Sequence, residues 1–400
     1  MTSMSLAAFS LKFLGHERDD LVSNNARVKM SATAAGMPVT PGHDWSLIWT
    51  FHTAWDSPNV IKRKRELPDR GKGTMLINHI PGTLRMASKA HLPAFMRSAG
   101  IPNTTPPTYQ LPEEMDKFMG ALSKSGLYDQ HGFPVWLLKK KTHRGVRALT
   151  NGTRAYLTAE RHMMVQRRVH PLLFRGLRRS FDIGLYVLVS SIEPLRAYVY
   201  EKALVRVCEA EYPTSASDFS NEATFVISKY TPIWNLPFFA ADLAKCDNSA
   251  VCALRRKLDE QGHNSAALFG EMKAVIMKLL AQLQPSSVAG AKRMDFAPET
   301  LFELFRFDFM VDAVARPSLT EVNFSPNLAG THPEDERTKD GLVQDTLRIV
   351  TRRLQLPPSA TAEEIAAAEV AVAGHFRKMD IQGLGREELP HERMAEILPN

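Results

Sequence analysis

The stretch FELFRFDFMVDAVARPSLTEVNFSPNL, residues 302–328, decides the fold because its side chains alternate in character. Phe305, Phe307 and Phe309 share one face of an extended chain, and Arg306 and Asp308 share the other. Successive side chains of a β-strand point to opposite faces of the sheet. The alternation therefore predicts a strand with one buried face.

A second alternating segment, SLTEVNF at 318–324, follows a short break that contains Pro317. Two strands around a short loop predict a β-hairpin in which Asp308 faces Glu321, with Asn323 on the same face as Glu321. Facing carboxylates repel each other unless a cation lies between them, and oxygen ligands suit Mg²⁺. Asp308, Glu321 and Asn323 are therefore candidate magnesium ligands. The alternative is that they lie on a solvated sheet face, as most charged residues of strands do.

Length and composition predict a globular chain of two or three lobes. It has 400 residues, of which 44% are hydrophobic and 23% are charged with mixed sign. The net charge of +7 favours an acidic partner: nucleic acid, an anionic membrane surface or an acidic protein segment. Aromatic residues are not interleaved with the basic clusters, which argues against nucleic acid. No apolar run reaches the roughly 18 residues of a membrane span.

The three cysteines, Cys208, Cys246 and Cys252, lack the spacing of a metal site. Free thiols are typical of proteins from a reducing compartment. The cysteines therefore predict three free thiols and a cytoplasmic protein.

Strands alternate with helical stretches along the chain, which predicts a mixed α/β fold. Helices are expected within 239–283 and over 361–379, where Thr361 and Glu364 form a capping box. The predicted division is a loosely ordered arm at 1–40, an amino-terminal lobe at 41–125, a central lobe at 126–207, a carboxy-terminal lobe with the metal site at 208–335 and a helical extension at 336–400.

Cationic residues precede the carboxylates along the chain. Lys139 ends an apolar strand before a polar loop that carries Arg144, and Arg206 closes a later strand. The strand that contains Gln166 has an edge that suits a flat ring. This order fits a nucleoside triphosphate clamped between two sheets, with Mg²⁺ between its phosphates and acidic side chains. The chain has no GxxxxGK[ST] motif, so the site is not a P-loop, and each basic residue taken alone is typical of a protein surface.

Four segments together resemble the tubulin-tyrosine ligase-like family. They are LINHIPG at 76–82, PVWLLKK at 134–140, the run from MVQRRV to ALVRV at 164–207, and the opening stretch. The resemblance implies an ATP-grasp fold and ATP-dependent ligation. A carboxylate on a tubulin tail would be phosphorylated to an acyl phosphate and then attacked by the amine of an amino acid.

The resemblance also implies roles for individual residues. It makes Asp308, Glu321 and Asn323 the Mg²⁺ ligands, Lys139 and Arg144 contacts of the ATP phosphates, Gln166 part of the adenine-contacting edge, and Arg206 a residue near the phosphates and the acceptor. Arg206 and Glu321 are the predicted catalytic residues.

Several positions depart from the family pattern, including the loop at 144–147, which lies one residue closer to Lys139 than usual. Gly184 stands where the family has an arginine after FDI, and Ser180 stands where it has a lysine before FD. Losing a cation that stabilises a developing acyl phosphate costs about 10²–10³ in rate. Arg147, Arg178 and Arg179 are candidate replacements. Asn78, His79 and Lys89 belong to an amino-terminal segment to which the resemblance gives no definite role.

Two functions are therefore predicted. The first is a monomeric ligase, with ATP and Mg²⁺ as cofactors, that adds an amino acid to acidic tubulin tails. Glutamate is the expected donor because glutamylation is the commonest activity of the family. The second is a catalytically impaired, ATP-binding module associated with microtubules. Both predict a cytoskeletal location that includes the cilium or flagellum.

Overall fold

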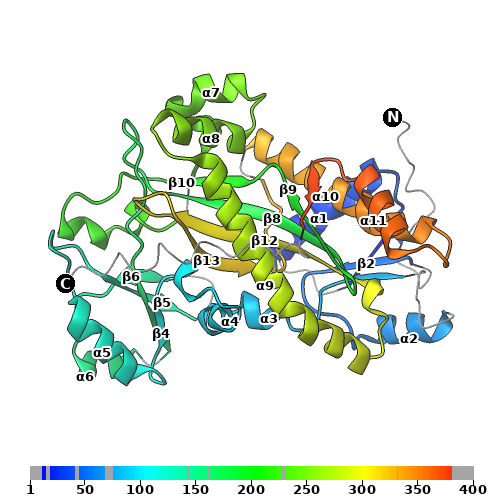
Figure 1. Ribbon diagram of the computed structural model, residues 1–400, viewed down its shortest axis with the longest axis horizontal. Helices are drawn as coiled ribbons and strands as arrows, with labels where there is room; N and C mark the ends of the chain where they lie inside the picture. Colours follow the sequence, from blue (N-terminus) through cyan, green and yellow to red (C-terminus); the bar gives the residue numbers. More distant parts are fainter. Residues whose placement is uncertain are drawn as a thin grey trace.

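The computed structural model describes residues 11–14, 19–40, 45–67, 75–141, 145–160, 162–227, 230–330 and 332–380. Their strands form one large sheet and one small sheet, with helices packed on both (Figure 1). The mixed α/β class predicted from the sequence is confirmed.

The large sheet has ten strands, and its main path runs β1-β2-β3-β12-β8-β10-β11. Strands β1, β2, β3 and β12 are parallel, and the remaining pairs are antiparallel. Off this path, β13 pairs with β12, β9 with β8, and β14 with β9. The bounds are β1 Leu11–Leu14, β2 Leu47–Thr50, β3 Leu76–Asn78, β8 Phe181–Ile192, β9 Leu195–Tyr200, β10 Leu204–Cys208, β11 Tyr230–Pro232, β12 Leu301–Val311, β13 Pro317–Asn323 and β14 Phe376–Lys378.

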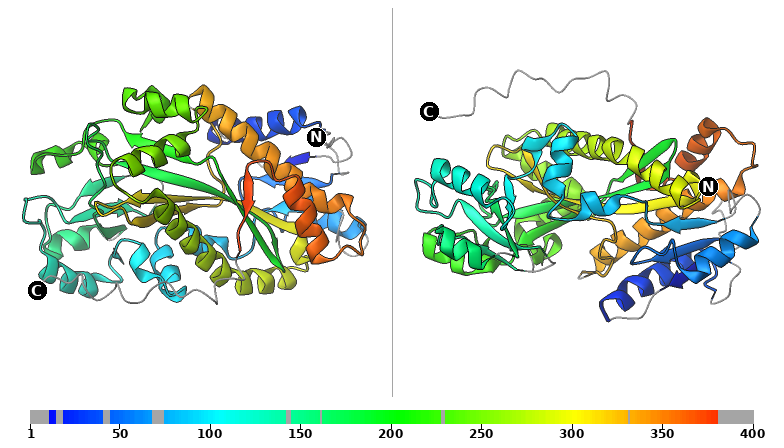
Figure 2. Two further views of the ribbon diagram at one scale, coloured as in Figure 1. Left: turned by 45° about the horizontal axis from the view of Figure 1, so that its top comes forward. Right: turned by 90° about the horizontal axis from the view of Figure 1, so that it is seen from below.

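Helices cover both faces of the large sheet, which explains why β8 is buried along its whole length (Figure 2). Helix α9 (Ser265–Arg293) shares one hydrophobic core with Phe305, Phe307 and Phe309, all fully buried. Helix α10 (Pro333–Arg352) shares the other core with Phe302 and Leu304. Helix α1 (Asp19–Ala34) packs on α10. The predicted buried face of phenylalanines is confirmed, but the prediction that only one face is buried is wrong, because the opposite face of β12 is covered as well.

The small sheet has the antiparallel order β4-β7-β5-β6 and a core of its own. Its strands are β4 Thr108–Gln110, β5 Trp136–Lys140, β6 Val146–Ala148 and β7 Met163–Arg167. Two helices flank it, α5 (Met115–Ser125) and α6 (Arg154–Ala159). Phe118 and Trp136 pack edge to face, with ring centroids 5.2 Å apart, and join α5 to the sheet.

The helices expected within 239–283 are confirmed as α7 (Ala240–Lys245), α8 (Ala250–Glu260) and the first part of α9. Three short helices lie between β2 and β4 in the sequence: α2 (Pro58–Glu66), α3 (Thr83–Ala87) and α4 (Leu92–Ser98).

The helix predicted over 361–379 is correct at its start and wrong at its end. The capping box of Thr361 and Glu364 opens α11, which spans Ala362–Ala371. Gly374 then has a φ of 57°, in the left-handed region where glycine is favoured, and the chain leaves the helix. Residues Phe376–Lys378 instead pair with β9 as strand β14, so sheet hydrogen bonds replace helical ones.

Pro317 lies at the start of β13 and not in the hairpin loop as predicted. A proline is tolerated at the first residue of a strand, where no N–H is required. The turn is formed at 312–316, where the Asp312 carboxylate accepts hydrogen bonds from the backbone N–H groups of Val314 and Arg316.

The prediction of three free thiols is wrong for two cysteines. Cys246 and Cys252 form a disulfide, because the short connection between α7 and α8 brings their Cα atoms within 5.7 Å. Cys208 is free and buried.

Within 1–40, the predicted arm, β1 joins the large sheet, and Arg27 on α1 forms an ion pair with Asp340 on α10 at 2.6 Å. The five-part domain division stays a prediction. Across the described ranges, no helix combines the length and the apolar character that crossing a membrane requires.

Candidate active site

The hairpin of β12 and β13 pairs Asp308 with Glu321, as the sequence predicted. Asn323 pairs with Arg306 on the same face, opposite the phenylalanine core. Asp308 is only 1% exposed, so the alternative of a solvated face is wrong for this residue. Glu321 lies nearer the surface, with 28% of its side chain exposed.

Four charged side chains form a network across β10, β8 and β12. Arg206 donates two hydrogen bonds to Asp182, at 2.8 and 2.5 Å, and its Nη2 lies 3.2 Å from Oδ2 of Asp308. Arg306 donates two more to Asp308, from Nε to Oδ1 at 2.7 Å and from Nη2 to Oδ2 at 2.9 Å. Charges are buried at acceptable cost only when paired and hydrogen-bonded, and here two guanidinium groups balance two carboxylates.

The two carboxylates of this network differ in their affinity for protons. Burial raises the pKa of Asp182 to about 6, because Arg206 only partly offsets the loss of water and the nearby charge of Asp308. Burial also acts on Asp308, but two guanidinium groups, Arg306 and Arg206, outweigh it and hold the pKa of Asp308 below its usual value. Asp308 is therefore a permanent anion at neutral pH.

The three predicted magnesium ligands do not occupy equivalent positions. Both oxygens of Asp308 already accept hydrogen bonds, including one from Nδ2 of Asn323 at 3.1 Å. With its nitrogen engaged, the amide of Asn323 has its oxygen left to offer a ligand. Among the described residues, no three His, Cys, Asp or Glu side chains are grouped as a metal site.

A pocket of about 270 Å³ opens beside Glu321 and Asn323, and its wall includes Lys89 and Lys141. Nζ of Lys89 lies 3.3 Å from Oε1 of Glu321. Lys141 follows the last residue of β5, so the pocket is shared by the small sheet and the hairpin. One carboxylate and one amide oxygen fit a Mg²⁺ ion that fills its shell with water and phosphate oxygens, whereas the lysines disfavour a bare cation.

Lys139 lies at the same junction. Its Nζ donates to Oε1 of Gln166 at 2.5 Å, and Nε2 of Gln166 donates to Oγ1 of Thr108 at 2.8 Å. Burial, together with the charge of Lys89, lowers the pKa of Lys139 to about 8, and Glu321 opposes this only in part. The structure thus brings Lys139 and Gln166 of the small sheet close to Glu321 of the large one.

Two further positions singled out from the sequence contribute no contact to the pocket in the structure as described. Arg144 lies outside the described residues. Ser180 is fully buried, and its hydroxyl lies 3.0 Å from the sulfur of Cys208. The ATP, adenine and magnesium roles of the predicted residues remain predictions.

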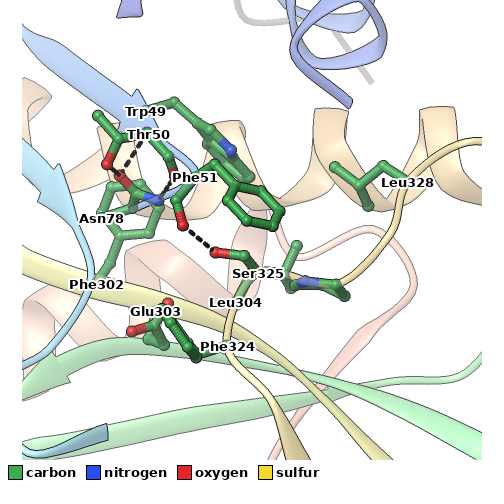
Figure 3. Close-up of a pocket in the computed structure, with 11 residues that line it drawn as sticks. Trp49, Thr50, Phe51, Asn78, Phe302, Glu303, Leu304, Phe324, Ser325 and Leu328 are labelled. Carbon is green, nitrogen blue, oxygen red and sulfur yellow. Dashed lines mark hydrogen bonds between the residues drawn. The ribbon is translucent and has the colours of Figure 1, made fainter. Parts of the chain in front are cut away.

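Asn78 and His79 hold the sheet together. The amide of Asn78 accepts from the Thr50 N–H at 2.8 Å and donates to the Thr50 carbonyl at 2.7 Å, which ties β3 to β2 (Figure 3). His79 is fully buried, and its Nδ1 lies 3.0 Å from Oε1 of Glu303 on β12. The cavity lined by Asn78 and Glu303 measures about 20 Å³, which is room for about one water molecule. It is too small for a substrate.

Sequence reasoning missed three residues of the site: Arg306, Asp182 and Lys141. The alternation of β12 already put Arg306 on the face of Asp308, and that signal was sufficient to include it. Asp182 sits two residues before Gly184 and therefore on the same face. Lys141 was hidden in a run of three lysines.

Cationic side chains of a small antiparallel sheet that face the acidic hairpin of a large sheet define an α/β protein of the ATP-grasp class. Residues 69–361 match the Tubulin-tyrosine ligase family, and the chain belongs to that family. The fold class predicted from the resemblance is thereby confirmed.

Several named proteins are similar to this chain. The probable tubulin polyglutamylase ttll-15 of Caenorhabditis elegans is 29% identical over 72% of the chain and 53% of its own length. Human tubulin polyglutamylase TTLL5 is 27% identical over 77% of the chain and 24% of its own length. Human tubulin monoglutamylase TTLL4 is 27% identical over 76% and 25%. The chain thus spans about half of the worm relative and about a quarter of the human ones.

Proposed function

We propose that the chain is an ATP-dependent ligase that adds glutamate to acidic tails of tubulin. The observation that carries the proposal is the pocket in which Lys89 and Lys141 meet Glu321 and Asn323 at the junction of the two sheets. The names of the similar proteins, tubulin polyglutamylases and a monoglutamylase, support the choice of glutamate and tubulin.

In the proposed reaction, Lys139 and Lys141 bind the phosphates of ATP from the side of the small sheet. Lysine is a compact charge that suits phosphate. Glu321 and the amide oxygen of Asn323 would hold Mg²⁺, which when bound neutralises phosphate charge. Arg206 forms ion pairs with Asp182 and Asp308, and its side chain is 14% exposed. Its positive charge would therefore attract the phosphates across these carboxylates without direct contact.

The chemistry has two steps. A carboxylate oxygen of the tail attacks the γ-phosphorus of ATP, ADP leaves, and an acyl phosphate forms. The amine nitrogen of glutamate then attacks the acyl carbon, phosphate leaves, and the amine loses a proton as the amide bond forms. The net charge of +7 favours the approach of acidic tails. A monomer on microtubules, including those of the cilium, is part of the proposal.

The test is incorporation of radiolabelled amino acid into microtubules with Mg²⁺ and ATP, with glutamate, glycine and tyrosine in separate tubes. We expect glutamate to be incorporated by the wild type and not by Glu321→Gln. Glu66→Gln is the matched control, because it removes the same charge from an exposed i,i+4 pair with Lys62, and neither residue lines the pocket.

The same assay separates the ligase from the impaired, ATP-binding module that Gly184 and Ser180 suggest. Incorporation of glycine or tyrosine instead of glutamate would show that glutamate is not the donor. Failure of all three, with thermal stabilisation by Mg²⁺-ATP intact, would favour the module. Thermal stabilisation that survives Glu321→Gln would show that this residue does not hold the metal.

A further inference from the structure

Gly184 leaves a space on the sheet that the side chain of Arg306 fills. Gly184 on β8 pairs with Asp308 on β12, and Arg306 lies two pairs further along, on the same face as Asp308. A Cβ atom at position 184 would come within 2.9 Å of Cδ of Arg306 and 2.9 Å of Oδ1 of Asp308. Atoms in contact normally lie about 3.5–4.0 Å apart, so even alanine would displace the Arg306–Asp308 pair.

The guanidinium of Arg306 binds the carboxylate of Asp308. Arg306 is 7% exposed, and its guanidinium donates two parallel hydrogen bonds to that carboxylate. Within the described part of the chain, Asp308 is its ion-pair partner. A two-pronged contact of this kind fixes the orientation of a carboxylate as well as its position.

The constraint passes from Asp308 to the pocket. Oδ2 of Asp308 accepts from Nδ2 of Asn323 at 3.1 Å, and Asn323 lines the pocket together with Glu321. Arg306 thereby determines how Asn323 presents its amide oxygen, although Arg306 itself does not line that pocket.

We infer that Gly184 and Arg306 form one functional unit, in which the arginine expected on β8 is supplied from β12 and acts as a positioning residue for Asp308 and Asn323. On this inference Gly184 is the space that the relocated side chain requires, and the departure at 184 is not a loss of charge from the site. The inference rests on the proposed function for its catalytic consequence and on contacts alone for its structural one.

The test compares the full-length wild type with Gly184→Arg, Arg306→Gly and the exchange variant that carries both substitutions. Each is assayed for thermal unfolding without ligand, for Mg²⁺-ATP affinity by calorimetry, and for kcat and KM in glutamate transfer. We expect each single substitution to weaken Mg²⁺-ATP binding by at least about tenfold, the effect of losing a hydrogen bond to a charged group.

The exchange variant tests whether an arginine at 184 can replace Arg306. Directly paired positions of adjacent strands have Cβ atoms about 4.5–5.5 Å apart, so an arginine at 184 reaches Asp308 once Arg306 is gone. We expect the exchange variant to recover most of the unfolding temperature and of the Mg²⁺-ATP affinity. Losses that add in the exchange variant would overturn the inference, as would an Arg306→Gly protein that binds like the wild type.

Arg306→Lys covers the case in which Arg306→Gly does not fold. It keeps the positive charge but cannot form the parallel pair of hydrogen bonds. We expect an unfolding temperature close to that of the wild type with a kcat reduced by about tenfold. Unchanged kinetics would show that only the charge matters, and the positioning role would be withdrawn.

Arg196→Gly is the matched control. Arg196 makes the same two-pronged, buried contact, with Glu369, at 2.9 and 3.1 Å. It should lower the unfolding temperature and leave Mg²⁺-ATP affinity unchanged. If the exchange variant recovers nucleotide binding but none of the proteins transfers glutamate, the proposed function is wrong and the inference stands. If the wild type transfers glutamate but the exchange variant does not recover nucleotide binding, the proposed function stands and the inference is wrong.

Discussion

Lys139 carries a charge that burial destabilises, so we expect the proposed nucleotide binding to depend on pH. Its pKa is lowered to about 8, so the free protein loses this cation as the pH rises through 8. We expect affinity for Mg²⁺-ATP to fall by about tenfold between pH 7 and pH 9, because binding requires the charged form. Calorimetry across this range measures the effect.

Lys139→Arg provides the comparison, because arginine stays charged throughout. The slope should flatten in that variant and persist in Lys117→Arg, whose side chain is exposed. An equal slope in Lys139→Arg would mean that another group titrates. The free energy of unfolding of the ligand-free protein should change in the opposite sense. It should rise from pH 8 towards 10.5, because the unfolded chain then keeps a proton that the folded chain has lost.

At the scale of single residues, the sequence predicted faces and not partners. The period of two put Asp308, Glu321 and Asn323 on one face, and the structure agrees. The same period could not reveal that Arg306 lies over Gly184, because that contact joins residues more than a hundred positions apart. The sequence therefore shows that an arginine is missing at 184 but does not show that Arg306 fills its place.

At the scale of elements, α11 shows how a surface helix is fixed to the sheet. Glu369 is 1% exposed and accepts hydrogen bonds from Ser190, Arg196 and Tyr198. Glu369→Gln leaves a buried guanidinium without its counter-charge. We expect a loss of about 3 kcal/mol in the free energy of unfolding, measured by urea denaturation.

Glu363→Gln on the same helix is the control for this prediction. Glu363 is exposed in the first turn of α11, where a negative charge contributes about 0.3–1 kcal/mol through the helix dipole. A loss of that small size in Glu369→Gln would show that the buried network does not hold α11.

Long elements were predictable and short ones were not. The hairpin, α8 and α9 contain enough periodic residues to be predicted from the sequence. Strand β14 has three residues, and its pairing with β9 is a tertiary contact that local sequence does not encode. The Cys246–Cys252 bond was missed for a similar reason, since it depends on how α7 turns into α8.

At the scale of the whole molecule, the proposed site draws residues from both sheets. Lys139 and Lys141 come from the small sheet or its edge, and Glu321 and Asn323 come from the large one. We expect Mg²⁺-ATP to slow amide hydrogen exchange in β5 and β7 and in the β12–β13 hairpin at the same nucleotide concentration. Mass spectrometry of peptides resolves these segments.

Glu321→Gln should abolish the protection in both segments together. Protection confined to the small sheet would mean that the nucleotide does not reach the hairpin. The meeting of the two sheets could be expected from the order of cations and carboxylates along the chain, but the lysines that line the pocket could not.

Strand β12 also limits how the molecule can move. Its first residues pair with β3 and the following ones with β8 and β13, so the amino-terminal strands and the acidic hairpin share one continuous ladder of backbone hydrogen bonds. Among the described residues, the small sheet has no ladder with the large one, and an isolated bridge of Pro171 with Asp312 links the segment after β7 to the end of β12. If the protein closes around a substrate, we therefore expect the small sheet to move and the acidic hairpin to stay fixed within the large sheet.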